Sequence, residues 1–192
     1  LKRISLCVSS ALVLACAPAA HAHIVDNVLE HSAPNAALQL TPIGSHESGV
    51  LGKSAAEIVA YHAASQRILT VNARSGEVDI LDASDPTKPR KIGALSAGGD
   101  KEINSVAVRP DGLAVAAVQQ AEKTDHGEAL FFNAETGEEL GRVGVGALPD
   151  NVHLTADGRH ALVANEGEPS DALNAEGTAY LKDPEGSISV IS

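Results

Sequence analysis

Three stretches of this chain can be laid over one another with a spacing of about 46 residues. Equivalent valines mark the three copies, at spacings of 47 and 46 residues: Val59, Val106 and Val152. A glycine opens a later apolar run in each copy: Gly76, Gly127 and Gly186. Repetition at this period restricts the fold to an array of small units, each of which buries its apolar face against its neighbours.

Each copy has the pattern of short β-strands separated by turns. In the first copy we expect strands at about 58–61, 67–73, 77–83 and 89–95. In the second copy we expect strands at about 105–109, 113–120, 128–134 and 139–145. After the N-terminal leader, no stretch keeps a helical period for about ten residues or more. The sequence therefore predicts an all-β fold.

Four strands in a repeat of this length are typical of a β-propeller blade. The alternative is a β-sandwich whose strand spacing repeats by coincidence. We expect three blades, at about residues 52–95, 103–146 and 149–192. Known propellers close with about four to eight blades, so three cannot form a ring. Residues 38–192 are therefore expected to be the N-terminal part of a larger propeller, incomplete at its C-terminus. Residues 38–44 are a candidate outer strand that closes the ring with a missing C-terminal blade.

Residues 1–22 have the organisation of a secretory signal peptide. A basic start is followed by an apolar run that is too short to span a bilayer, and the residues ending at Ala22 fit signal peptidase cleavage. The alternative is a lipoprotein signal in which Cys16 carries the lipid. Cleavage after Ala22 leaves residues 23–37 as an N-terminal linker and removes both cysteines. We expect an exported protein, periplasmic, cell-surface or extracellular, without a transmembrane segment in this part of the chain.

The charge of the chain argues against nucleic-acid binding. Its formal net charge is −11, from 25 acidic and 14 basic residues. Binding to phosphate backbones needs clusters of Lys and Arg, and the sequence has none. The histidines do not have the spacing of a zinc site, and there is no nucleophile elbow of the G-x-S-x-G type. The acidity is compatible with an exported protein that binds cations.

Three segments carry a resemblance to a known family: AEIVAYHAASQRILTVNARSGEVDILDASDP, GALPDNVHLTADGRHALVANEGEPS and DPEGSISVIS. They resemble the opening of choice-of-anchor I proteins, exported bacterial propeller proteins named for their varied C-terminal cell-surface anchors. The resemblance covers roughly residues 38–192 and implies a seven-bladed propeller similar to lactonases and YVTN-repeat proteins. Members of the family frequently carry an alkaline phosphatase label. This chain departs from the family where ALNAEGTAYLK replaces a longer acidic insert.

In a propeller, the first strand of each blade lines the central channel, and the loops entering that strand lie on one face. Function concentrates on loops that a rigid scaffold holds in place. Polar residues occupy the equivalent position before each first strand: Glu57, Asn104 and Asp150. We predict that these side chains form a ligand or cation site at the channel mouth. The alternative is that they solvate a water-filled tunnel.

An acidic stretch follows the second strand of the third repeat, between Asn165 and Gly186. Calcium prefers about six to eight oxygen ligands, and closely spaced acidic residues in a loop rich in Gly and Pro can supply them. The spacing is not that of an EF-hand, and a solvated acidic loop is the alternative. The sequence predicts a calcium site with these ligands: Glu166, Glu168, Asp171 and Asp183.

These features lead to two hypotheses for the function. The first is an exported cell-envelope or extracellular propeller module that binds an unidentified ligand, cell-surface partner or cation on its loop face. The alternative is a calcium-dependent hydrolase of phosphate esters, in which metal ions neutralise the phosphate and activate water. The first is favoured because the sequence shows no nucleophile or general base, and because a fold does not determine a function.

Overall fold

The computed structural model describes residues 34–38, 40–52 and 54–192. The expected signal peptide, with Cys16 and Ala22, and most of the expected linker lie outside these residues. The described part is all-β and contains 11 strands in three antiparallel sheets. It has no helix that could cross a membrane.

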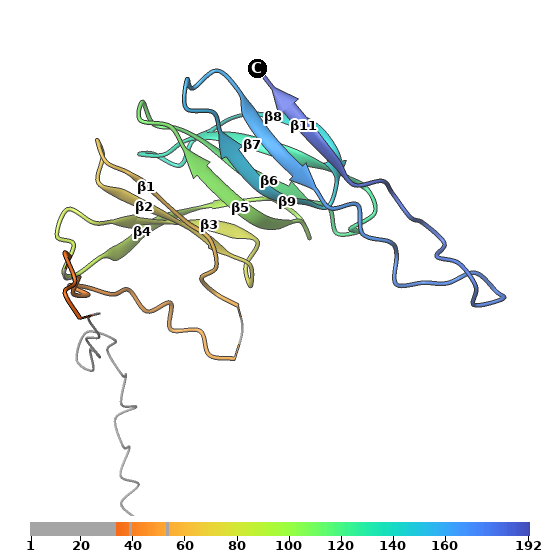
Figure 1. Ribbon diagram of the computed structural model, residues 1–192, viewed down its shortest axis with the longest axis horizontal. Helices are drawn as coiled ribbons and strands as arrows, with labels where there is room; N and C mark the ends of the chain where they lie inside the picture. Colours follow the sequence, from red (N-terminus) through yellow and green to blue (C-terminus); the bar gives the residue numbers. More distant parts are fainter. Residues whose placement is uncertain (1–33, 39, 53) are drawn as a thin grey trace, which may run out of the picture.

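Each sheet is a meander in which strands adjacent in sequence are also neighbours in space (Figure 1). The first sheet contains β1 (Val59–His62), β2 (Arg67–Asn72), β3 (Glu77–Asp82) and β4 (Arg90–Ser96). The second contains β5 (Glu102–Val108), β6 (Leu113–Gln119), β7 (His126–Asn133) and β8 (Glu139–Ala147). The third contains β9 (Pro149–Leu154), β10 (Ala161–Asn165) and β11 (Ser187–Ile191). The expected strands of the first two repeats are thus present in order.

Four strand starts differ from the expectation, those of β1, β4, β5 and β7, and the shifts of β5 and β4 have local reasons. β5 begins at Glu102 rather than near residue 105, because a bulge between Ile103 and Ser105 lets pairing continue to Glu102 opposite Gln119. β4 begins at Arg90 rather than at Pro89, because proline has no N–H to donate to the ladder. Both shifts depend on backbone pairing, which the alternation of apolar residues does not report.

The core lies between the sheets, and β6 is buried on both of its faces. Its residues Ala114, Ala116 and Val118 pack towards the first sheet, in a cluster that also holds Leu69 and Phe132. The alternate residues of β6 belong to a second cluster against the third sheet: Val115 and Ala117. A strand with two buried faces needs an apolar residue at every position, which explains the unbroken run LAVAAV.

In each of the first two sheets, a side chain at the end of the first strand contacts the next sheet along the chain. In the first sheet, His62 Nε2 lies 3.2 Å from the carbonyl oxygen of Pro110, in the β5–β6 turn of the second sheet. In the second sheet, Arg109 Nη1 donates to the carbonyl oxygen of Gly158, in the β9–β10 turn of the third, at 2.6 Å. The two side chains lie three residues after the equivalent valines, so the repeat also determines the contact between sheets.

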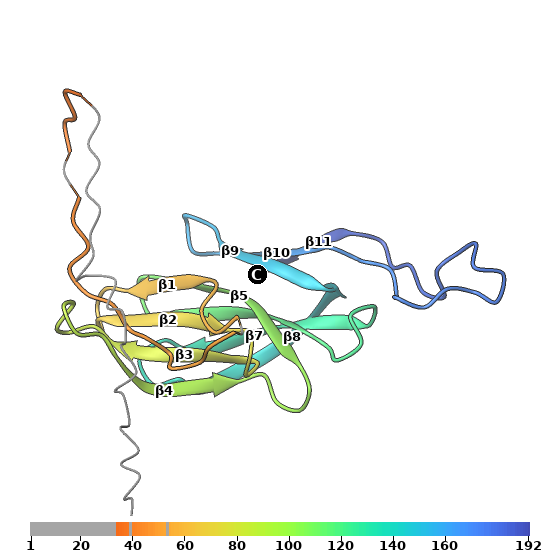
Figure 2. The same cartoon turned by 90° about the horizontal axis from the view of Figure 1, so that it is seen from below.

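Two further segments lie outside the sheets. Leu38 and residues 40–52 form no strand, and Leu38, Leu40 and Ile43 are exposed, so the role expected for 38–44 in ring closure stays a prediction. The connection between β10 and β11 projects far beyond the sheets, which is clearest in the view from below (Figure 2). This connection contains the acidic stretch of the sequence.

Candidate functional site

Several connections between strands meet at one end of the sheets, and we call this side the loop face. The connection after β10 begins against the one between β8 and β9: Glu166 N donates to Leu148 O at 2.9 Å, and Gly167 N donates to Ala147 O at 3.2 Å. The β6–β7 connection reaches the same place through Lys123, which contacts Glu168. Three connections from two sheets therefore come together at the predicted site.

The β10–β11 connection, residues 166–186, is a hairpin with its own hydrogen bonds, and we call it the arm. Ser170 N donates to Lys182 O at 2.8 Å, and Leu181 N donates to Ala172 O at 3.0 Å. Further out, Leu173 pairs with Tyr180 in an isolated antiparallel bridge. The acidic stretch therefore forms a hydrogen-bonded hairpin and not an irregular loop.

The arm leaves the third sheet through a narrow neck made by two glycines. Gly167 has a φ of +66°, which glycine adopts readily. A Cβ atom on Gly167 would lie 2.5 Å from the backbone nitrogen of Gly186. The outgoing and returning segments of the arm can therefore pass this close only because residue 167 has no side chain. Gly186 in turn lies against the carbonyl oxygen of Glu166.

Two lysines hold the arm to the β6–β7 connection through reciprocal ion pairs. Lys123 Nζ, in that connection, lies 3.1 Å from Glu168 Oε2 and 3.0 Å from Asp171 Oδ1 of the arm. In the opposite sense, Lys182 Nζ of the arm lies 3.1 Å from Asp125 Oδ1. Hydrogen bonds to Asp171 and Glu168 raise the pKa of Lys123 above its ordinary value. We call these contacts the clasp.

The predicted calcium ligands have different surroundings. Glu168 and Asp171 pair with the ammonium group of Lys123, and both of them are exposed, as is Asp183. Glu166 is exposed, and partial loss of solvation, and then the negative charges of Asp150 and Glu168, raise its pKa. Within the described residues, no three His, Cys, Asp or Glu side chains are arranged to hold a metal ion.

The residues predicted at the channel mouth lie at equivalent places near the starts of the first strands. Glu57 lies just before β1 and is exposed, and Asp150 is an exposed residue of β9. Asn104 is engaged in a contact between sheets: its Nδ2 donates to Pro149 O at 3.0 Å and to Gln119 Oε1 at 2.8 Å. Asn104 therefore positions β9, the strand that carries Asp150.

Sequence reasoning missed the partners of the acidic side chains. Lys123 and Asp125 lie in the connection after β6, to which the sequence alone assigned no role. Each lies at least 45 residues along the chain from its partner in the arm. The available signal was the isolated lysine in each of two acidic connections, Lys123 and Lys182.

The repeated antiparallel sheets, with several of their connections gathered on one face, define an all-β repeat protein. This chain belongs to the choice-of-anchor I domain family, whose model matches residues 57–192. The match begins at Glu57, before the first strand, and includes the entire arm. Membership of this family fits an exported protein.

The first of three similar solved structures supports the fold and indicates no activity. The chain is similar to a luciferin-regenerating enzyme at 12% identity and a TM-score of 0.51, covering 73% of this chain and 46% of that one. It is also similar to a protein of unknown function from Bacteroides caccae, at 19% identity and a TM-score of 0.41, covering 56% of this chain and 37% of that one. A third similar structure is hydrazine synthase from Kuenenia stuttgartiensis, at 13% identity and a TM-score of 0.36, covering 71% and 50%.

The chain therefore spans half or less of the length of these three structures. No curated protein matches it.

Proposed function

We propose that this chain is part of an exported β-propeller that binds a ligand, a cell-surface partner or a cation on its loop face, in the periplasm, at the cell surface or outside the cell. The three sheets are consecutive blades of that propeller, which has seven in all. The apolar residues on the outward sides of the terminal sheets support further blades. Val59 and Tyr61 are exposed on the first sheet, and Ile188 and Val190 are exposed on the third.

One observation carries the binding site: the meeting of carboxylates where the arm leaves the third sheet. Glu166 is exposed and lies near Asp150 and Glu168, and partial loss of solvation, followed by these two negative charges, raises its pKa. Like charges held close together disfavour ionisation, and a bound cation would relieve that repulsion. Glu166 and Asp150 are therefore the carboxylates best placed to attract a cation.

Calcium is the cation we propose, because it accepts carboxylate and carbonyl oxygens in flexible geometry. The ligands are Glu166, Glu168, Asp171 and Asp183, joined by Asp150 from the channel mouth. Glu168 and Asp171 now contact Lys123. Calcium must therefore compete with the ammonium group for these two carboxylates.

Calorimetric titration with calcium tests the site. The wild-type chain should bind calcium, and the double variant Glu166→Gln/Glu168→Gln should lose that binding. The matched control is Glu135→Gln/Glu138→Gln, which removes two exposed carboxylates from the β7–β8 turn. An equal loss in both double variants would show that net charge, and not the loop face, governs binding. No heat of binding in the wild type would remove calcium from the proposal.

A calcium-dependent hydrolase of phosphate esters is the alternative, and it would use the same carboxylates. Such an enzyme also needs positively charged side chains to bind the phosphate group. Lys101 Nζ is held 2.9 Å from Glu128 Oε2, which leaves Arg74 as an exposed arginine on the first sheet near this end. Turnover of para-nitrophenyl phosphate that a chelator abolishes, and that is lost in Glu166→Gln/Glu168→Gln, would favour the enzyme. Calcium binding without turnover would favour the binding module.

A further inference from the structure

The turn between β1 and β2 brings a serine into direct contact with a histidine, at the end of the sheets opposite the loop face. His62 Nδ1 lies 2.6 Å from Ser65 Oγ. Both residues belong to the first repeat, and neither contributes to the arm or to the predicted channel mouth. The pair is therefore separate from the function proposed for the loop face.

The surroundings of His62 determine which of its ring nitrogens carries the proton. Nε2 lies 3.2 Å from the carbonyl oxygen of Pro110, which can only accept a hydrogen bond, so Nε2 is the protonated nitrogen of the neutral ring. Nδ1 then has a lone pair, and the hydroxyl of Ser65 donates to it. The proton of the serine is thus directed at a base, which is the arrangement that activates a serine as a nucleophile.

Packing between the first two sheets holds the ring of His62 in this orientation. The residue is buried, with only 6% of its surface exposed. A Cβ atom on Gly112 would lie 3.3 Å from Cε1 of the ring, so the ring lies directly against the β5–β6 turn. The carbonyl of Pro110 then orients the base towards the serine, as the third member of a catalytic triad does.

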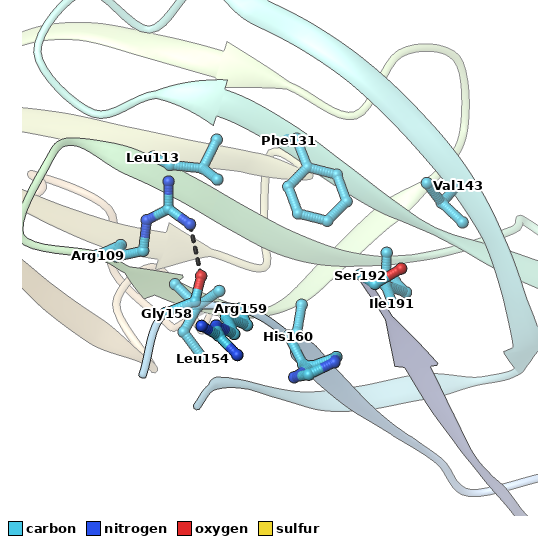
Figure 3. Close-up of a pocket in the computed structure, with 11 residues that line it drawn as sticks. Arg109, Leu113, Phe131, Val143, Leu154, Gly158, Arg159, His160, Ile191 and Ser192 are labelled. Atoms are coloured by element: carbon cyan, nitrogen blue, oxygen red, sulfur yellow. Dashed lines mark hydrogen bonds between the residues drawn. The ribbon is translucent and has the colours of Figure 1, made fainter. Parts of the chain in front are cut away.

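The other two repeats have no general base at the equivalent position. In the second sheet this position is Arg109, which donates to the carbonyl oxygen of Gly158 at 2.6 Å (Figure 3). A guanidinium group stays protonated in proteins, so it can connect two sheets but cannot accept a proton. In the third repeat the equivalent residue is Thr155. Because the contact between sheets needs only a donor, a histidine paired with a serine is more than that contact requires.

The hydroxyl of Ser65 is within reach of a small substrate. Ser65 is half-buried, and the two residues before it in the turn, Ala63 and Ala64, are small and exposed. The turn is closed by Gln66 N, which donates to Ala63 O at 3.3 Å. The amides of Ala64 and Ser65, in the middle of the turn, have no acceptor among the residues that the structure describes. They are available to donate to the oxyanion that forms when a serine attacks an ester.

We propose that Ser65 is a nucleophile that accepts acyl groups from small activated esters, with His62 as its general base. Ser65 Oγ bonds to the carbonyl carbon while its proton passes to His62 Nδ1. The ester C–O bond then breaks, the departing alkoxide takes that proton and leaves as an alcohol, and the acyl group stays on the serine. Water attacks the acyl carbonyl in the same way, His62 returns the proton to Ser65 Oγ, and a carboxylic acid leaves. A short acyl group is expected, because alanine side chains provide little apolar contact.

Diisopropyl fluorophosphate tests the proposal on the complete chain, because an activated serine displaces its fluoride and keeps the phosphoryl group. Peptide mass spectrometry should find the label on Ser65, and the labelled protein should no longer hydrolyse para-nitrophenyl acetate. Ser65→Ala should lower the rate of that hydrolysis by about a hundredfold or more. The absence of label on Ser65, or hydrolysis that persists in Ser65→Ala, would overturn the proposal.

Ser75→Ala is the matched control, because Ser75 also lies in a turn between strands but its hydroxyl faces the carbonyl oxygen of Asn72, which is not a base. An equal loss of hydrolysis in both serine variants would overturn the assignment of Ser65.

A second variant tests the base. His62→Gln keeps a donor for Pro110 O but cannot take up a proton, so labelling of Ser65 should slow by about a hundredfold. Labelling at the wild-type rate would show that Ser65 is an ordinary hydroxyl. If His62→Gln lowers the urea midpoint of unfolding, the comparison of Ser65→Ala with Ser75→Ala decides the proposal without it.

Discussion

Arg109 and Gly158 join the second sheet to the third: Nη1 of the arginine donates to the carbonyl oxygen of the glycine at 2.6 Å. A Cβ on Gly158 would lie 3.0 Å from Cδ of Arg109, so the arginine packs directly over the turn. His62 makes the equivalent contact from the first sheet, over Gly112 and to the carbonyl oxygen of Pro110. The same position in successive repeats thus connects neighbouring sheets with different chemistry.

Replacing this arginine should weaken the joint between the sheets. In Arg109→Ala, the carbonyl of Gly158 and the carboxylate of Asp111 lose their partner, so the urea midpoint of unfolding should fall. Arg90→Ala is the control, because Arg90 also pairs with an aspartate but is 73% exposed, against 31% for Arg109. Exposed pairs contribute little, so the control should change the midpoint much less. Equal shifts would show that the contact between sheets adds no stability.

Adjacent phenylalanines on β7 provide a test of the core. Phe132 is completely buried between the first two sheets, so Phe132→Ala should cost about 3–5 kcal/mol of the free energy of unfolding. Phe131 points to the opposite side of β7, where it packs against the second core cluster and is only partly buried. Phe131→Ala should therefore cost about half as much or less, on the order of 1–2 kcal/mol. Urea unfolding measures both, and the reverse order would contradict the placement of the core.

Glu128 should make the stability depend on pH in the acidic range. Hydrogen bonds from Lys101 and then Arg142 lower the pKa of Glu128 below its ordinary value of 4.5. Its stabilising contribution is therefore complete above pH 4.5 and is lost as the pH falls through the lowered pKa. Glu128→Gln should be less stable than the wild type near neutral pH, and the difference should vanish in acid. A difference independent of pH would contradict this role of the charge.

The neck of the arm should be intolerant of side chains. Gly167→Ala places a methyl group against the backbone of Glu185 and Gly186 at a positive φ, and should cost about 2–4 kcal/mol. Gly177, near the tip of the arm, has a similar φ of +67° but open space around it. Gly177→Ala should therefore lower the free energy of unfolding only by the cost of holding alanine at a positive φ, about 1 kcal/mol. Equal free energies of unfolding for the two variants would show that the crossing is not tight.

The clasp should determine how firmly the arm is held. Lys123→Gln removes the contacts to Glu168 and Asp171, so amide hydrogen exchange across residues 170–182 should become faster. Because the pairs are partly exposed, raising the salt concentration should have the same effect on the wild type and little further effect on the variant. Lys88→Gln, at an exposed lysine in the β3–β4 turn, is the control. Exchange that is insensitive to both changes would mean that the clasp does not hold the arm.

Most of the fold could be predicted because its causes are local. Alternation and turn residues identified the strands of the first two repeats, and a tight turn at Asp111 and Gly112 lies between β5 and β6. The bulge at Ile103 could not be predicted in this way, since it depends on the register with β6. Repetition then extended each local prediction to the next sheet.

The candidate site was predictable only in outline. The acidic composition of the arm indicated its importance, but the contact of Lys123 with Asp171 joins two connections 48 residues apart in sequence. Such a contact depends on how both loops leave their sheets, and no short-range pattern records that.

The crossing of Gly167 and Gly186 has an evolutionary consequence. The third sheet requires two small residues where the chain departs and returns, because a Cβ atom on either one would meet the backbone of the other segment. Sequence and length can then diverge within the segment between these two residues while the sheets are preserved. Related proteins could thus acquire new specificity by changing this one segment, while the array of sheets stays the same.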